Sequence, residues 1–242
     1  MTMFSSMWFG SENTIVIDIT SNTFEQNILT LAEAKGYVAA TSTNKIIVNI
    51  ASGVTVLGLT TYSLRTGALN ADSDVVININ GNIDSYTGTS GGLVAVPGSA
   101  GGDAIYWETN TGGSGSYVVN VASGASVRSG GGGGGGGGNR GSRYEFVGKS
   151  ECGGPIIYGS YGSTGAAGGF GEDGTQGSSG TFGGGAVGCE ITYPGAGGAG
   201  GAAGYALRKN GRTITVNNSG SSSRIIRFRA ILWLPRWLRQ RT

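Results

Sequence analysis

The sequence predicts a mostly β and irregular fold, with a small N-terminal α/β region, a glycine-rich sandwich of polyglycine II helices and a C-terminal strand segment. Glycine supplies 50 of 242 residues, it recurs at every third position over long stretches, and short alternating apolar runs flank it. So much glycine removes side chains from a core and raises the entropy lost on folding, which disfavours an ordinary globule. A hydrophobic content of 38% and a net charge of +2 equally disfavour a disordered chain.

The first ninety residues resemble conventional α/β sequence. Alternating or β-branched apolar residues predict strands at Thr14–Ile19, Lys45–Ile50 and Asp74–Ile79. Between the first two strands, Asn22–Lys35 places its apolar residues on one helical face, and Gly36 follows as a stop signal. We therefore expect a short helix packed on a small sheet.

A weak repeat runs through the chain. The segment Ile47–Gly53 (IVNIASG) is nearly duplicated by Val118–Gly124 (VVNVASG), and shorter echoes occur at Ile77–Gly81 and Val216–Gly220. In each case an apolar alternation is followed by Asn and then by Gly, as in a strand that leaves through a turn. Two interpretations remain open: independent strand-turn units, or strands stacked as successive rungs.

The central part of the chain repeats with a period of three. The glycines in this phase are Gly162, Gly165, Gly168, Gly171, Gly174, Gly177, Gly180, Gly183, Gly195, Gly198, Gly201 and Gly204. This period fits neither an α-helix nor a β-strand, but it fits the extended left-handed helix with three residues per turn. Such a helix has no internal hydrogen bonds, so neighbouring segments must satisfy its backbone groups.

Two packings could satisfy these backbone groups. One is a collagen triple helix of three chains, and the other is a bundle of polyglycine helices from a single chain. Collagen needs about 15–20% proline or hydroxyproline, whereas this chain has four prolines. The composition therefore favours the single-chain bundle, in which the uninterrupted run Gly130–Gly138 also fits because glycine lets helices approach closely.

Glycine and charge divide the chain into three predicted parts. Forty-one of the 50 glycines lie between Gly91 and Gly204, while residues 191–242 carry nine basic and no acidic residues. We expect an assembly or attachment region at residues 1–90, the polyglycine-helix domain at 91–218 and a basic extension at 219–242.

The composition weighs against several function classes. The chain contains no His and two Cys, so the usual ligands of transition metals and the usual proton shuttle are scarce or missing. We expect no catalysis, no metal and no cofactor. The sequence has no apolar run near 18 residues and no basic start of a secretory signal, which predicts a soluble protein made in the cytoplasm.

The order of the glycine-rich motifs resembles a known family. The stretch Pro97–Gly102, the Asn120 strand leading into Gly130–Gly138, and the block Gly200–Gly204 with its short tail strand look like the glycine-rich tip adhesin of the long tail fibre of T-even-type bacteriophages. The resemblance covers about residues 79–218. Residues 1–78 look instead like the strand-helix-strand lead-in of many phage proteins with glycine-rich tails.

This resemblance implies a role at the distal tail fibre of a virion, for a protein synthesised in the host cytoplasm. In that family, a sandwich of polyglycine helices presents variable loops that recognise a bacterial outer-membrane protein or lipopolysaccharide. Other tail-fibre subunits are the implied partners, a homotrimer is an open alternative, and no nucleic-acid partner is expected. The rival interpretation is a purely structural fibre or collar protein with collagen-like trimeric packing.

Two interruptions of the glycine pattern, at residues 139–161 and 186–194, correspond to the recognition loops by this resemblance. They are rich in Arg and aromatic residues, which dominate binding hot spots. The expected receptor-binding residues are Arg140, Arg143, Tyr144, Phe146, Tyr158, Tyr161, Ile191 and Tyr193. Packing of these aromatics over the glycine block is the alternative. Cys152 and Cys189 fall one in each interruption and could join them by a disulfide, or could be reduced thiols.

The basic extension has three candidate roles. Its apolar run Ile231–Leu234 includes Trp233, and Trp237 and several Arg residues follow the run. Docking on a fibre subunit is expected first, contact with lipopolysaccharide second and nucleic-acid binding last.

Overall fold

The computed structural model describes most of the chain. It covers residues 14–41, 43–92, 94–108, 113–147, 151–181, 189–192 and 194–219, with the backbone alone at 143–147, 151–155 and 189–192. The basic extension beyond residue 219 therefore lies outside the described residues.

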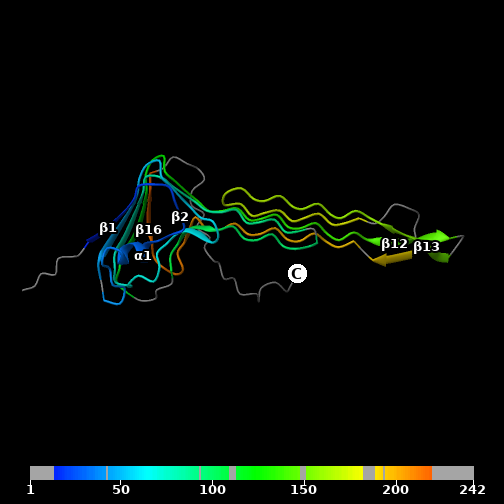
Figure 1. Ribbon diagram of the computed structural model, residues 1–242, viewed down its shortest axis with the longest axis horizontal. Coiled ribbons are helices and arrows are strands. Elements are labelled where there is room, and N and C mark those ends of the chain that lie inside the picture. The colour runs from blue at the N-terminus through cyan, green and yellow to red at the C-terminus, as the bar shows by residue number, and fades with distance from the viewer. Residues whose placement is uncertain are drawn as a thin grey trace, which may run out of the picture.

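Three parallel sheets wind around one apolar core (Figure 1). The first consists of β1 (Thr14–Ile19), β4 (Lys45–Ile50), β7 (Val75–Ile79), β10 (Tyr117–Val121) and β16 (Thr215–Asn218), in that order. The second consists of β2 (Thr23–Phe24), β5 (Thr55–Leu57), β8 (Asn82–Asp84) and β11 (Ser126–Arg128). The third consists of β3 (Gln26–Asn27), β6 (Tyr62–Arg65), β9 (Asp103–Tyr106) and β15 (Leu207–Arg208). Each turn of the chain adds one strand to each sheet, so these strands form a three-sided parallel β-helix, which we call the hub.

The hub forms because its strands alternate between core and solvent. Strand β4 buries Ile46, Val48 and Ile50 completely, while the residues between them stay partly exposed. The other strands of the first sheet stack in register on β4, so equivalent apolar residues form continuous columns. Burying one such side chain stabilises the fold by about 1.5–3 kcal/mol.

An amide ladder on the outer face of the first sheet confirms the stacked-rung interpretation of the sequence repeat. Asn49, Asn78, Asn120 and Asn217 occupy one register position, and Asp18 precedes them in β1. Each Asn Nδ2 donates to the side-chain oxygen of the preceding rung, over 2.8–2.9 Å. The repeated Asn of the sequence is therefore a link between rungs, not a turn residue.

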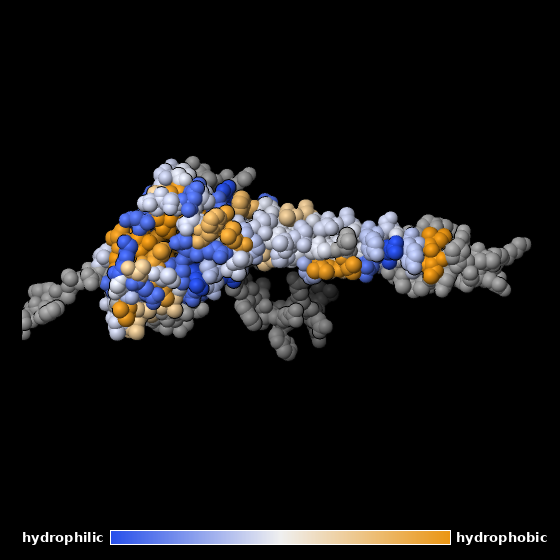
Figure 2. All heavy atoms as spheres, in the orientation of Figure 1, coloured by the Kyte–Doolittle hydropathy of each residue, from blue (hydrophilic) through white to orange (hydrophobic). Residues whose placement is uncertain are grey.

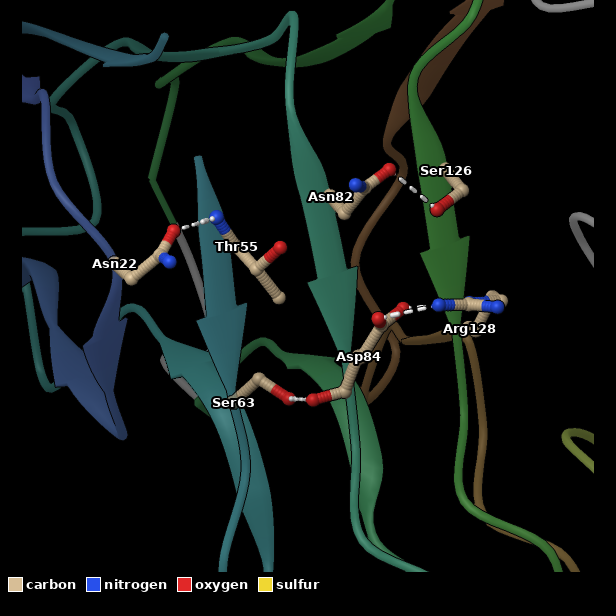
Figure 3. Close-up of polar contacts among 7 residues, drawn as sticks. All are labelled: Asn22, Thr55, Ser63, Asn82, Asp84, Ser126 and Arg128. Carbon is tan, nitrogen blue, oxygen red and sulfur yellow. Dashed lines mark hydrogen bonds and ion pairs between the residues drawn. The ribbon is translucent and has the colours of Figure 1, made fainter. Parts of the chain in front are cut away.

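The predicted helix is shorter than the sequence suggests. Helix α1 spans Ile28–Glu33, and Asn27 caps it by accepting a hydrogen bond from the backbone of Leu29. The residues before it join β2 and β3, because their backbone groups pair with the next rung. Asn22, expected at the helix start, instead accepts a hydrogen bond from the Thr55 backbone, as Figure 3 shows. Strand pairing overrides the helical pattern here.

The glycine-rich block consists of two insertions into the hub. Both leave the second sheet, after β8 and after β11, and both return to the third sheet at β9 and β15. Side by side in Figure 1, they extend away from the hub as long parallel segments. Strands on both sides of residue 90 belong to the same sheets. The predicted boundary at this residue therefore does not separate two structural units.

The run Gly130–Gly138 is the buried central helix of this block. All nine of its carbonyls accept hydrogen bonds, from segments near residues 88–95, 162–168 and 198–204. Its amides donate to two further segments, near residues 96–102 and 172–178. A Cβ added at any of the nine positions would lie closer than 3.0 Å to backbone atoms of a neighbouring segment. The glycine run is uninterrupted because the central helix has neighbours on every side.

The periodic glycines confirm the single-chain bundle. The amides of Gly162, Gly165 and Gly168 donate to every third carbonyl of the central helix, and those of Gly198, Gly201 and Gly204 do the same from another side. Gly174, Gly177 and Gly180 donate in turn to the segment 195–201. Lateral hydrogen bonds that recur at every third residue are the pattern expected of packed polyglycine II helices. One chain thus supplies the lateral partners of all these segments.

Gly171 departs from the predicted pattern. It lies at the turn between two segments, with φ of +73°, and its amide donates to the carbonyl of Ser129 at 3.1 Å. Glycine is favoured there because other residues rarely adopt a left-handed conformation. Gly183, predicted in the same series, lies outside the described residues.

Two ion pairs join neighbouring strands of the hub where the chain leaves for the block and where it returns. Asp84 and Arg128 end the two outgoing strands, and Arg128 Nε donates to Asp84 Oδ1 at 2.6 Å (Figure 3). Asp103 and Arg208 lie on the two returning strands, with Arg208 Nε 2.5 Å from Asp103 Oδ2. Arg128 also lies against the ring of Phe170 at the turn of the block, 4.5 Å from its centroid.

These contacts favour the charged arginines. Hydrogen bonding to Asp84 raises the pKa of Arg128. Burial acts to lower the pKa of Arg208, but the hydrogen bond and negative charge of Asp103 outweigh it and raise that pKa overall. Both guanidinium groups therefore stay charged.

Replacing Asp103 with alanine should lower the free energy of unfolding by about 3 kcal/mol. The Asp103 side chain is 8% exposed and also accepts the Tyr205 amide at 2.7 Å, so its loss leaves several donors unsatisfied. Glu108→Ala is the matched control, because it breaks a more exposed pair with Arg65 at 3.4 Å and should cost less than about 1 kcal/mol. Urea unfolding of both variants measures the difference, and equal effects would contradict this account of the junction.

Candidate functional site

The far end of the glycine block carries an antiparallel sheet. It contains β12 (Ser142–Val147), β13 (Glu151–Tyr158) and β14 (Cys189–Thr192), in the order β13-β12-β14. Figure 1 places β12 and β13 at the end opposite the hub. The two interruptions of the glycine pattern, expected as loops, therefore pair with each other as strands of one sheet.

Arg140 lies where the central helix passes into this sheet. The backbone of the following residue, Gly141, donates to Thr181 at 3.0 Å and accepts from Gly159 at 2.9 Å. These bonds join the end of the central helix to two other segments of the block. Arg140 is therefore presented from a fixed backbone.

Two tyrosines flank the Arg140 side chain. The guanidinium carbon lies 4.2 Å from the ring centroid of Tyr158 and 5.2 Å from that of Tyr161. The two tyrosines remain 52% and 49% exposed, and Arg140 is exposed as well. Cation–π contacts at exposed sites contribute about 0.5–1 kcal/mol each, enough to order the side chains without burying them. We call these three residues the tyrosine–arginine cluster.

The structure brings most of the other predicted binding residues onto the same sheet. Arg143 pairs with Ile157 and Glu190 on the neighbouring strands, and Tyr144 pairs with Ile156 and Cys189. Phe146 and Ile191 belong to β12 and β14. Tyr193 lies outside the described residues.

The two cysteines lie on strands that are not adjacent. Cys152 of β13 pairs with Phe146, and Cys189 of β14 pairs with Tyr144, with β12 between them. Two strand spacings of about 4.8 Å exceed the Cα separation of about 7 Å that a disulfide tolerates. Of the two alternatives that the sequence left open, a disulfide or reduced thiols, the backbone register favours the reduced thiols.

Sequence reasoning missed two features of the site. It missed the cluster of Arg140 with its two tyrosines, because their spacing of 18 and 21 residues follows no helix or strand period. It also missed the sheet, because β13 contains two consecutive glycines and a proline, which are depleted in strands. The aromatic and arginine content of residues 139–161 was the one signal that pointed to this region.

Within the part of the chain that the structure describes, no group of three or more His, Cys, Asp or Glu side chains could hold a metal ion. In the same part, no helix has the length and apolarity needed to cross a bilayer. Figure 2 shows hydrophilic and apolar side chains next to each other towards the far end of the block. A narrow block that rises from a β-helix and exposes aromatic and cationic side chains at its far end is the architecture of a binding protein.

Comparison with known families agrees with this class. The family model of the phage tail fibre adhesin Gp38 matches residues 14–224. The chain therefore belongs to the phage tail fibre adhesin Gp38 family, and it is a bacteriophage virion protein of the tail fibre. The match includes most of residues 1–78, so the prediction that this region departs from the family was wrong from residue 14 onward.

A solved structure is also similar to this chain. It is the crystal structure of the gp37–gp38 adhesin tip complex of the bacteriophage S16 long tail fibre, with 18% identity and a TM-score of 0.48. The similarity covers 86% of this chain and 82% of that one. No curated protein sequence matches this chain.

Proposed function

We propose that this tail-fibre adhesin binds a bacterial surface receptor with the far end of its glycine block, and that it acts by binding alone. The convergence of residues 139–161 and 189–192 on one sheet, opposite the hub, carries this proposal. The receptor is an outer-membrane protein or lipopolysaccharide. The binding residues are the tyrosine–arginine cluster together with Arg143, Tyr144, Phe146, Ile191 and Tyr193.

The scaffold supports this role physically. Backbone hydrogen bonds between its segments order the glycine block, and Ser and Thr side chains add further bonds within it. The sequence at the far end can therefore vary without refolding the block, as in other proteins that present binding residues on a rigid scaffold. A preordered site also loses less entropy when it binds.

The experiment uses the purified full-length protein and cells of a susceptible strain. Saturating the cells with protein should block adsorption of the phage. Cells stripped of outer-membrane proteins, or carrying truncated lipopolysaccharide, should identify the receptor by losing the bound protein. Failure of the protein to bind intact cells would overturn the proposal.

We further propose that the hub attaches this adhesin to another tail-fibre subunit at the distal end of the fibre. Strands β11, β15 and β16 each end a sheet among the described residues, and each pairs on one side only. Unpaired strand edges can accept a strand from another chain. Copurification of the adhesin with fibre subunits, lost when Thr215–Asn218 is deleted, would support this attachment.

The collagen-like structural alternative finds little support in the hydrogen bonds. The nine carbonyls of the central helix all accept amides from its own chain. Three chains are therefore not needed to satisfy them, and we expect the isolated adhesin to sediment as a monomer. A stable trimer that unfolds when it dissociates would restore the alternative.

A further inference from the structure

We propose that the tyrosine–arginine cluster binds an anionic glycan, through a phosphate or carboxylate group held by Arg140 and sugar rings held by Tyr158 and Tyr161. This inference rests on the proposed receptor-binding function and adds the chemical class of the ligand. It concerns the base of the far sheet, where the central helix ends.

The Arg140 guanidinium lies over two aromatic rings and is itself exposed. Its carbon lies over both tyrosine rings, at 4.2 and 5.2 Å from their centroids. Among the described side chains, no carboxylate forms an ion pair with Arg140. Stacking on aromatic faces leaves the N–H groups in the guanidinium plane free to donate. That planar fork matches the oxygens of a phosphate or carboxylate in a bidentate contact.

The backbone around the cluster is fixed before any ligand binds. Tyr158 precedes Gly159, whose amide donates to Gly141, and Tyr161 precedes Gly162, whose amide donates to Gly138 at 2.9 Å. Between them, the amide of Ser160 donates to the Thr181 hydroxyl at 3.0 Å. Each tyrosine is therefore followed by a glycine whose amide is hydrogen-bonded to the end of the central helix. The backbone of the cluster is already ordered, so little backbone entropy is lost on binding.

The exposed ring surface distinguishes a glycan from an acidic protein loop. An acidic side chain can pair with the guanidinium, but it has no flat apolar face of its own to cover the two half-exposed tyrosine rings. A pyranose ring presents an apolar C–H face that packs on an aromatic ring, and its hydroxyls can bond the phenol oxygen. An anionic group between two sugars can thus engage the arginine while the sugars cover the rings.

The test measures binding of the full-length protein and its Arg140→Ala, Arg140→Lys and Tyr158→Leu variants. The probes are lipopolysaccharide from a susceptible strain, the same material after removal of phosphate, the same after reduction of carboxyl groups, and host outer-membrane proteins in detergent. Arg140→Ala should weaken lipopolysaccharide binding at least tenfold, and Arg140→Lys nearly as much, because an ammonium cannot combine stacking with a bidentate contact. The melting temperature of each variant should fall only slightly, because the contacts that are lost lie at an exposed site.

The two chemically treated lipopolysaccharide samples identify the anionic group. Loss of affinity after removal of phosphate assigns the contact to phosphate, and loss after carboxyl reduction assigns it to a carboxylate. Equal affinity of wild type and Arg140→Ala for lipopolysaccharide would overturn the inference. Binding to the outer-membrane proteins alone would also overturn it, while leaving receptor recognition intact. If the wild-type protein binds no intact cells, the proposed function itself fails.

Discussion

Substitution of Gly134 by alanine should lower the free energy of unfolding by about 3 kcal/mol or more. A Cβ at this position would overlap the carbonyl of Gly165, and the neighbouring atoms are all backbone. Overpacking usually costs about 1–3 kcal/mol when side chains can move aside, and here none can. The neighbouring segments must separate, which also weakens the hydrogen bond from Gly91 to the Gly134 carbonyl.

Gly92→Ala is the matched control for this prediction. A Cβ at Gly92 meets no atom within 4 Å, and its φ is not left-handed. Alanine there should be neutral or stabilise the protein by a few tenths of a kcal/mol, because it restricts the unfolded chain. Urea unfolding of both variants decides the matter, and similar midpoints would contradict close packing around the central helix.

Replacing Tyr144 or Phe146 with alanine should abolish attachment to host cells while leaving the melting temperature nearly unchanged. Both residues belong to β12, the middle strand of the far sheet, and large aromatic residues contribute most to binding hot spots. Losing one hot spot of about 2–4 kcal/mol reduces affinity by roughly 30- to 1,000-fold. The measurement is retention of labelled protein on cells.

Phe24→Ala serves as the control, because Phe24 is 56% exposed on the hub, far from the receptor end. This variant should bind cells as the wild type does. A large drop in the melting temperature of the Tyr144 or Phe146 variants would instead assign these residues to packing of the far sheet. Normal attachment of both variants would place the receptor contact elsewhere.

The regular parts of the fold were predictable from the sequence. The strands Thr14–Ile19 and Lys45–Ile50 have the predicted bounds, because their apolar alternation reflects one buried face. The period of three in glycine predicted the extended helices, since only glycine permits such close approach. The Asn repeat indicated stacked rungs as one of two interpretations.

The remaining features depend on contacts between residues that are distant in the sequence. Strands of two or three residues, such as Thr23–Phe24, are too short for a period to be recognised, and only the next rung defines them. The same pairing shortens the predicted helix to Ile28–Glu33. Asp103 and Arg208 are separated by 105 positions, so the junction has no local signal. The tyrosine–arginine cluster is likewise defined by the ends of separate segments.

Hydrogen exchange of the central helix tests the account most directly. In protein labelled with ¹⁵N-glycine, the amides of Gly132, Gly133, Gly135, Gly136 and Gly138 should exchange slowly, because each donates to a neighbouring segment inside the block. Gly53, exposed at a turn, should exchange quickly and serves as the internal reference. Exchange of the central amides as fast as that of Gly53 would contradict the packed block, and with it the rigid presentation of the receptor-binding end.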